Sequence, residues 1–285
     1  MANPPPQLLL TAPPPPPRPY GLFDVALGPM PFPSANSVGG GVQYVPDTCE
    51  DGIYLYAMNC PAVSGSKTFM GVEAAISGAP FGVVASYSCG PVGFSFEEAA
   101  ERVRTRMALH EQRAVEKRVW SGTTLGNDRG VIAGLFRNAT DLGASACVTD
   151  AVAKLEQALA DNGIVGGLIH ARPYMASHLA QAHLLEKGPG RSCVTKRYTP
   201  VVFGEGYDGT GPAGEAVTAT VEYMYASGRI AIWQDAEVFI PPPGQVLNKS
   251  TNELNLVGEK IFAAAVECGV WTTAVTRSCA TTGVV

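Results

Sequence analysis

Charged residues are scarce in this chain of 285 residues. Only 16% of the residues are charged, against roughly 25% in an average soluble domain, whereas 46% are hydrophobic. The formal net charge of −5 argues against tight electrostatic binding of nucleic acid. The apolar fraction is sufficient for a sizeable core, and few charges are left to cover the exterior. We therefore expect part of the surface to be buried against other chains.

Long hydrophobic runs and metal-ligand patterns are lacking as well. Gly, Pro, Ser and Asn interrupt the uncharged stretches, so no transmembrane helix is predicted. The N-terminus has no basic region, and the run Leu8–Leu10 is too short for a signal peptide. The seven cysteines form no CxxC pair and have no histidines at zinc-ligand spacing. Their odd number and scattered positions predict reduced, buried thiols from a cytosolic folding environment.

Proline is concentrated near the N-terminus. Thirteen of the 23 prolines lie within residues 1–46, which carry only two charges. The Pro-rich runs favour extended polyproline II, which makes no internal hydrogen bonds and builds no core. Composition alone favours a disordered tail or an aromatic-groove ligand. Because the segment still contains apolar clusters, we expect Leu8–Leu10 and Tyr20–Val25 to lie on a neighbouring subunit.

Residues 52–94 have the composition of a long hairpin-like excursion. They are rich in Gly, Ser, Ala and Val. Two short β-like runs, Ile53–Met58 and Phe81–Tyr87, flank a polar tip at residues 64–67.

The clearest single element is a long charged helix. Ser95 and Glu98 have the spacing of a capping box, and neither Gly nor Pro occurs from there to Trp120. Residues 97–118 contain eleven charged residues. A helix of about 25 residues would span about 37 Å. Such a helix fits a strut that meets other chains, and it fits an ordinary surface helix equally well.

The rest of the chain mixes helices and strands. A cap at Thr149 or Asp150 starts a helix, and a second helix begins at Pro173 and reaches about Leu185. The run Val217–Tyr225 alternates, and a turn at residues 226–228 predicts a hairpin with residues 229–239. The helix that starts at the cap runs through Ala151–Leu159. The remaining predictions are strands at Gly167–Ala171 and Thr199–Phe203, and an element at Leu254–Val270 whose periodicity fits helix and strand alike.

Motifs for chemistry are weak. The loop Gly204–Gly209 lacks the Lys-Ser/Thr pair of a phosphate-binding loop and is predicted to be a turn. A hydrolase could use Cys147 as nucleophile, His170 as base and Asp150 as the orienting group, but nothing in the sequence brings these residues together. No catalytic, cofactor-binding or metal residues are therefore assigned.

An arm, a two-stranded excursion, a long charged helix and an α/β segment follow one another along the chain. Four sets of residues within them are distinctive: Arg106–Glu116 with Val119–Gly122, 166–171 with Pro173, 199–207, and 255–268. In this order they resemble the spine helix, the axial domain (the second and third sets) and a long peripheral strand of the major capsid proteins of tailed bacteriophages with the Hong Kong 97-like fold, above all those from phages of actinobacteria. The last of these sets favours a strand at Leu254–Val270.

The resemblance implies an α+β fold in which residues 1–50 form the N-arm and 51–94 the extended loop. Residues 95–163 with 241–285 would form the peripheral domain, and 164–240 the axial domain. The family needs no cofactor and is not enzymatic. Some members join subunits by a Lys–Asn isopeptide bond. Lys67 lies near the loop tip where such a lysine would sit, but its Asn partner cannot be assigned, so this bond stays open.

The function implied is a shell protein that assembles into hexamers and pentamers around double-stranded DNA, in a virion built in the host cytoplasm. A portal and scaffolding or decoration proteins are its implied partners. DNA contact would be weak and non-specific, and no membrane is involved. An encapsulin-type nanocompartment on the same fold and an unrelated Cys-dependent hydrolase are the alternatives. Contacts between subunits are expected at Leu8, Leu9, Leu10, Tyr20, Phe23, Lys67, Arg106 and Arg113.

Overall fold

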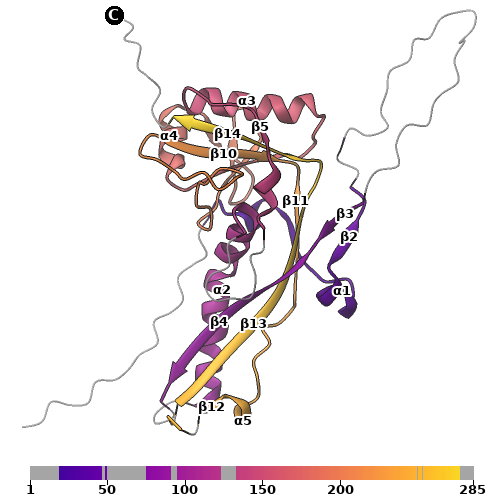
Figure 1. Cartoon of the computed structure of the whole chain (residues 1–285), viewed down its shortest axis with the longest axis vertical. Coiled ribbons are helices and arrows are strands. Elements are labelled where there is room, and N and C mark those ends of the chain that lie inside the picture. Colours follow the sequence, from indigo (N-terminus) through magenta and orange to yellow (C-terminus); the bar gives the residue numbers. More distant parts are fainter. Residues whose placement is uncertain are drawn as a thin grey trace, which may run out of the picture.

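The computed structural model describes residues 19–46, 49, 75–90, 95–122, 133–248, 250–251 and 253–276. Within these ranges the chain forms two large sheets, and it passes between them at residues 228–229 and again at residues 267–269. A long helix runs beside one of the sheets (Figure 1). The predicted run Ile53–Met58 and the polar tip at residues 64–67 lie outside the described residues.

The five-stranded sheet is built around one long strand, β13 (Glu253–Val266). Phe262 and Ala263 pair with β11 and also with β4, so these two partners lie on opposite edges of β13. The pairing with β4 is antiparallel and continuous from Leu254 to Ala263. The other strands are β4 (Pro80–Cys89), β11 (Ile230–Gln234), β12 (Leu247–Asn248) and β1 (Leu27–Pro31), the last parallel to β11.

A single long helix, α2 (Phe96–Trp120), packs along β4 and β13. Its start is the predicted capping box: Glu98 N donates to Ser95 Oγ at 3.1 Å, and Ser95 N donates to Glu98 Oε2 at 2.8 Å. Side chains alternate strictly along the first half of β13, buried toward α2 and exposed on the other side. We call α2, β4 and β13 together the strut. Among the described helices, none is long and apolar enough to cross a membrane.

The seven-stranded sheet forms the other half of the molecule. Helices α3 (Val148–Asp161) and α4 (Met175–Gln181) pack on it, with Leu155 and Leu179 fully buried in the shared core. Only the pairs β6–β9 and β14–β5 are parallel. In spatial order the strands are β5 (Thr140–Asp141), β14 (Val270–Thr276), β10 (Val221–Ser227), β6 (Leu168–Ala171), β9 (Pro200–Phe203), β8 (Cys193–Thr195) and β7 (Leu185–Lys187).

Short elements join these parts. Leu22 and Phe136, from two 3₁₀ turns, are fully buried in a cluster that also contains the C-terminal end of α2. The short elements are η1 (Leu22–Asp24), η2 (Leu135–Asn138), α1 (Ala35–Gly40), α5 (Pro243–Val246) and a separate antiparallel pair of strands, β2 (Val42–Tyr44) with β3 (Ile76–Gly78).

The predicted hairpin at residues 226–228 is wrong. β10 pairs with β6 and β14 in the seven-stranded sheet, whereas β11 pairs with β1 and β13 in the five-stranded sheet. The turn therefore carries the chain from one sheet to the other. The strand also begins at Val221, so residues 217–220 lie outside it. Alternation along the sequence reports which side chains share a face, but it does not identify the partner strand.

Two helix boundaries also differ from the predictions. The N-cap of α3 is Cys147, and Asp150 Oδ2 instead accepts a hydrogen bond from Ala146 N at 3.1 Å. Helix α4 ends at Gln181, because His183 adopts a left-handed φ of 55° and the chain then enters β7. The strand interpretation of Leu254–Val270 is confirmed for residues 254–266, which lie in β13.

Candidate assembly surface and sheet junction

Two arginines of α2 contact β4, of which Arg102 is partly exposed and Arg106 exposed. The guanidinium groups of Arg102 and Arg106 lie over the Tyr87 ring, 5.3 and 4.9 Å from its centre. Arg106 Nη1 also donates to the Ser86 carbonyl at 2.6 Å. Arg106 was predicted to contact another subunit, but its guanidinium already contacts its own chain.

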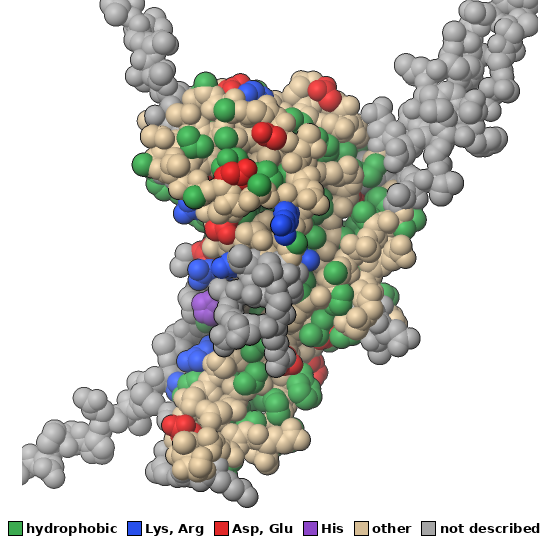
Figure 2. Space-filling view, in the orientation of Figure 1, with side chains coloured by type: hydrophobic (Ala, Val, Ile, Leu, Met, Phe, Trp, Pro, Cys, Tyr) green, Lys and Arg blue, Asp and Glu red, His purple; other side chains and the backbone are tan. Residues whose placement is uncertain are grey.

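The outer surfaces of the strut are polar with isolated apolar side chains. On α2, Arg113 is exposed, and 36% of Leu109 remains accessible. On the far side of the β4–β13 pair, Val84 is 59% exposed and Val257 37%. Figure 2 shows Lys and Arg side chains gathered along the α2 side and hydrophobic side chains spread over the β4–β13 side.

The start of the described chain is attached to the body. Phe203 N donates to the Tyr20 carbonyl at 2.8 Å, and Tyr20 N donates to the Arg191 carbonyl at 3.2 Å. Leu22 is fully buried in its own chain, so the expectation that all of Tyr20–Val25 lies on a neighbouring subunit is wrong. Phe23 stacks on Phe262 with ring centres 6.5 Å apart. Tyr20 is 41% exposed and Phe23 partly exposed.

Glu116 joins three segments at a buried position. Its carboxylate accepts hydrogen bonds from Leu22 N at 2.9 Å, Gly206 N at 3.0 Å and Gln112 Nε2 at 3.0 Å. Burial raises the pKa of the Glu116 carboxyl above its usual range, although these three donors oppose the shift. A Cβ at Gly206 would lie 2.1 Å from the Arg113 carbonyl oxygen. The glycine therefore lets the 204–209 turn approach α2.

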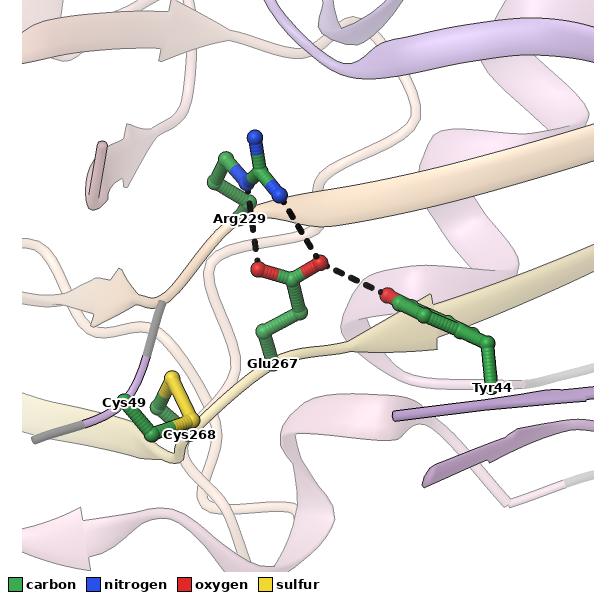
Figure 3. The surroundings of a disulfide bond; sticks show 5 residues. All are labelled: Tyr44, Cys49, Arg229, Glu267 and Cys268. Carbon is green, nitrogen blue, oxygen red and sulfur yellow. Dashed lines mark hydrogen bonds and ion pairs between the residues drawn. A yellow bond between two sulfur atoms is a disulfide. The ribbon is translucent and has the colours of Figure 1, made fainter. Parts of the chain in front are cut away.

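Two connections cross side by side between the sheets, and we call residues 227–229 with 267–269 the junction. Glu267 N donates to the Arg229 carbonyl at 2.9 Å, and Gly228 N donates to the Gly269 carbonyl at 3.1 Å. The Glu267 side chain is fully buried and forms an ion pair with Arg229, with N–O distances of 3.1 and 3.4 Å. Tyr44 Oη, from β2, donates to the same carboxylate at 2.9 Å (Figure 3).

A disulfide bond between Cys49 and Cys268 lies beside this ion pair (Figure 3). It links positions 219 residues apart in the sequence, with Cα atoms 5.4 Å apart. In the structure this pair is oxidised, so the prediction that the cysteines are all reduced does not hold for it there. No signal in the sequence indicates this pairing, because each cysteine is brought to the other by strands that belong to different segments.

Comparison with solved structures identifies the fold. The chain aligns with the capsid of an empty GTA particle over 95% of its own length and 94% of the other chain, with a TM-score of 0.58 and 12% identity. It aligns with a chain of Mycobacterium phage Ogopogo over 96% and 97% (TM-score 0.54, 12% identity) and with the capsid of Ralstonia phage GP4 over 95% and 94% (0.51, 11%). The chain has the Hong Kong 97-like fold. No protein-family model and no curated protein matches the sequence.

The Hong Kong 97-like fold confirms the predicted α+β class. The structure also bears on the hydrolase alternative through His170. His170 is fully buried, and its ring nitrogens lie 2.9 Å from Tyr207 Oη and 2.8 Å from Ser227 Oγ. Burial lowers the pKa of His170 to about 3. Both ring nitrogens are occupied, so this histidine is not available as a base for Cys147.

Other sequence-based expectations fare differently. The 204–209 segment is a turn as predicted, with Tyr207 N donating to the Gly204 carbonyl at 3.2 Å. Leu8, Leu9, Leu10 and Lys67 lie outside the described residues. In the described ranges, no group of three or more His, Cys, Asp and Glu side chains is arranged to hold a metal ion.

Sequence reasoning missed Glu116 and the Tyr44–Glu267–Arg229 network. A signal existed for Glu116, because it is an acid between Val115 and the Val119–Trp120 pair on the apolar stripe of a predicted helix. No comparable signal marks the junction.

Proposed function

We propose that this chain is a major capsid protein, which assembles into the icosahedral shell around the double-stranded DNA of a tailed phage. The observation that carries the proposal is the alignment over almost the full length of both chains with the capsid of a GTA particle. Agreement over 95% and 94% of the two chains includes the strut as well as the seven-stranded sheet. A shared core domain with unrelated additions would not give this coverage.

The strut supports the proposal from the chain itself. One helix covers one face of β4 and β13, and the opposite face keeps Val84 and Val257 accessible. A closed shell needs heterologous contacts that repeat around five- and six-fold rings. Long, incompletely covered elements provide surface for such contacts.

In this proposal the seven-stranded sheet with α3 and α4 corresponds to the axial domain, and the five-stranded sheet with α2 to the peripheral domain. The two sheets refine the ranges inferred from the sequence, 164–240 for the axial domain and 95–163 with 241–285 for the peripheral domain. The sheet adds β5, α3 and β14 to the axial part and moves β11 to the peripheral part. Residues 1–50 and 51–94 remain assigned as N-arm and extended loop.

The contacts between subunits remain proposals. Arg113, like Arg106, is exposed on α2, and it is the stronger candidate of the two. Tyr20 and Phe23 retain accessible surface after docking on their own chain. Arg106 is a weaker candidate because it binds Ser86 and Tyr87. Leu8, Leu9, Leu10 and Lys67 keep the roles proposed from the sequence.

The partners beyond other copies of this chain are also proposed. A portal would occupy one vertex, and scaffolding or decoration proteins would bind during or after assembly in the host cytoplasm. The net charge of −5 supports only weak, non-specific contact with the packaged DNA.

Purified protein tests the proposal directly. Light scattering and negative-stain electron microscopy should detect rings or closed shells. A monodisperse species of one chain under all assembly conditions would overturn it. Shells purified from infected cells should contain nuclease-protected DNA, whereas an encapsulin-type shell would contain an enzyme cargo instead.

Deletion of residues 2–18 isolates the contribution of the N-arm. The deletion stops before Tyr20 because Leu22 belongs to the core. We expect the truncated chain to remain folded by circular dichroism and to form fewer or less heat-resistant shells. Shells as heat-resistant as those of the full chain would remove the arm from the proposal.

A further inference from the structure

Cys268 occupies a tightly constrained turn. Its φ is 63°, in the left-handed region, and Gly269 follows with a φ of 148°. A Cβ at Gly228 would lie 2.1 Å from the Glu267 carbonyl oxygen, so the two crossing backbones are in close contact. Cys268 is thus held at a fixed position between the two sheets.

Cys49 is brought to this turn by contacts that do not depend on the disulfide. Tyr44, five residues earlier, donates its hydroxyl to the buried Glu267 carboxylate. The Tyr44 ring also packs edge-on against Trp233, with ring centres 5.4 Å apart. A chain with both cysteines reduced would therefore still keep β2 at the junction, with the two thiols close together.

We propose that Cys49 and Cys268 form a redox-operated latch on the junction, which is open in the reducing host cytoplasm and closes after the particle is released. The second half of this statement rests on the proposed capsid function. Both cysteines are partly exposed, so a small disulfide can reach them.

Closure proceeds by thiol–disulfide exchange with a small disulfide such as oxidised glutathione. The thiolate of one cysteine attacks the glutathione disulfide, forming a mixed disulfide and releasing one glutathione thiol. The thiolate of the second cysteine then attacks the cysteine sulfur of the mixed disulfide and releases the second glutathione. The chain loses two thiol protons and two electrons, and one glutathione disulfide takes them up to become two thiols.

The closed latch restrains two segments at once. It ties the segment after β2 to the turn between β13 and β14, where the chain passes between the sheets. Because the bond closes a loop of 219 residues, it removes much conformational freedom from the unfolded chain. We expect the oxidised protein to resist heat better than the reduced protein without a change of fold.

The experiment compares full-length protein incubated with oxidised glutathione or with a reductant. Peptide mapping without reduction should find Cys49 joined to Cys268, and intact mass should fall by about 2 Da on closure. The melting temperature of the oxidised protein should be about 10 °C higher. Cys49→Ser should abolish this difference, whereas the matched control Cys89→Ser, on β4, should retain it.

Tyr44→Phe tests whether the hydrogen bond to Glu267 prepares the latch. This variant keeps the ring on Trp233 and loses only the hydroxyl. The rate of disulfide formation should fall about threefold or more, because β2 lies at the junction in a smaller fraction of the chains. The disulfide formed at the end should be the same. An unchanged rate would overturn this positioning role.

The results separate the latch from the capsid function. Equal melting temperatures of oxidised and reduced protein, or mapping of a different cysteine pair, would overturn the latch even if shells form. A redox-dependent melting temperature in a chain that never assembles would support the latch as a device of the chain and overturn the capsid proposal.

Discussion

The seven-stranded sheet and the strut bury their apolar residues in different ways. In the seven-stranded sheet, α3 and α4 cover a continuous core in which Leu155, Ile169 and Met224 are fully buried. In the strut, α2 covers only one side of β4 and β13, and 59% of Val84 remains accessible on the other side. The first region is self-sufficient, whereas the second has surface left for contacts with other chains.

The difference has an energetic consequence. Burial stabilises by about 25 cal/mol for each Å² of apolar surface removed from water. The seven-stranded sheet obtains this within one chain. The exposed side of the strut can obtain it only from a neighbour, so substitutions in the two regions should affect different measurements. The sheet should control folding, and the outside of the strut should control assembly.

The largest expected effect is in the core of the seven-stranded sheet. Leu155→Ala should lower the free energy of unfolding by about 2–5 kcal/mol, because it leaves a cavity at a fully buried position. Denaturant unfolding followed by circular dichroism measures this loss. A change below about 1 kcal/mol would contradict the self-sufficient core, since a tightly packed site cannot collapse around the missing atoms.

The next effect concerns Glu116, where the strut meets the N-terminal segment. Glu116→Gln should lower the free energy of unfolding by about 1–3 kcal/mol. The reason is that an amide NH₂ group replaces one carboxylate oxygen, which accepts a hydrogen bond from Leu22 N or Gly206 N. Denaturant unfolding at neutral pH measures this change. A free energy of unfolding equal to that of the wild type would contradict this prediction.

The pH dependence of Glu116 gives a second measurement. Its folded-state pKa is raised by burial, so its contribution to stability is complete below the unfolded value of about 4.5 and declines as the pH rises through the folded value. Above pH 4.5 the free energy of unfolding of the wild-type protein should therefore fall with rising pH by an amount that Glu116 causes. This fall should be missing in Glu116→Gln. An identical pH profile for both proteins would argue against a raised pKa.

A smaller effect is expected where the exposed Arg106 of α2 contacts β4. Arg106→Glu loses the hydrogen bond to the Ser86 carbonyl and the contact with the Tyr87 ring. It should lower the free energy of unfolding, measured by denaturant unfolding, by about 1 kcal/mol. Arg106→Lys is the conservative control, since it keeps the charge. If Arg106→Glu fails to assemble, this indicates a subunit contact only when its free energy of unfolding is unchanged.

The smallest effect on folding is expected at Arg113, on the exposed side of α2. Arg113→Glu should change the free energy of unfolding by less than about 0.5 kcal/mol but reduce shell formation measured by sedimentation. Arg104→Glu provides a control, because it reverses a charge on the same helix within an exposed pair with Glu101. Full assembly of Arg113→Glu would exclude this residue from the subunit contacts.

Local signals predicted the elements that depend on neighbouring residues in the sequence. Ser95 and Glu98 marked the start of α2 because both capping hydrogen bonds join residues three apart. The resemblance to capsid proteins favoured a strand at Leu254–Val270 where periodicity alone fitted both structures. The assembly residues remain predictions, because nothing within one chain identifies a contact with another.

The errors arose where distant segments meet. The alternating run ending at Tyr225 was paired with the next strand, although β10 and β11 lie in different sheets. Leu22 was assigned to a neighbouring subunit, because no local pattern indicates that Glu116 accepts a hydrogen bond from its backbone. Cys49 and Cys268 were taken as reduced, because a separation of 219 residues gives no sign of a shared turn.

By itself the sequence determined the long capped helix and the alternation within strands, since both follow from residues close to one another in the chain. It also determined the scarcity of charge, which is a property of the composition. Only the tertiary structure decided which strands pair, where the chain crosses between the sheets and which cysteines meet at the junction. Those choices depend on how well side chains from remote segments fill a shared core, as Leu22, Phe136 and Tyr225 do. Such complementarity exists only when all the partners are in place.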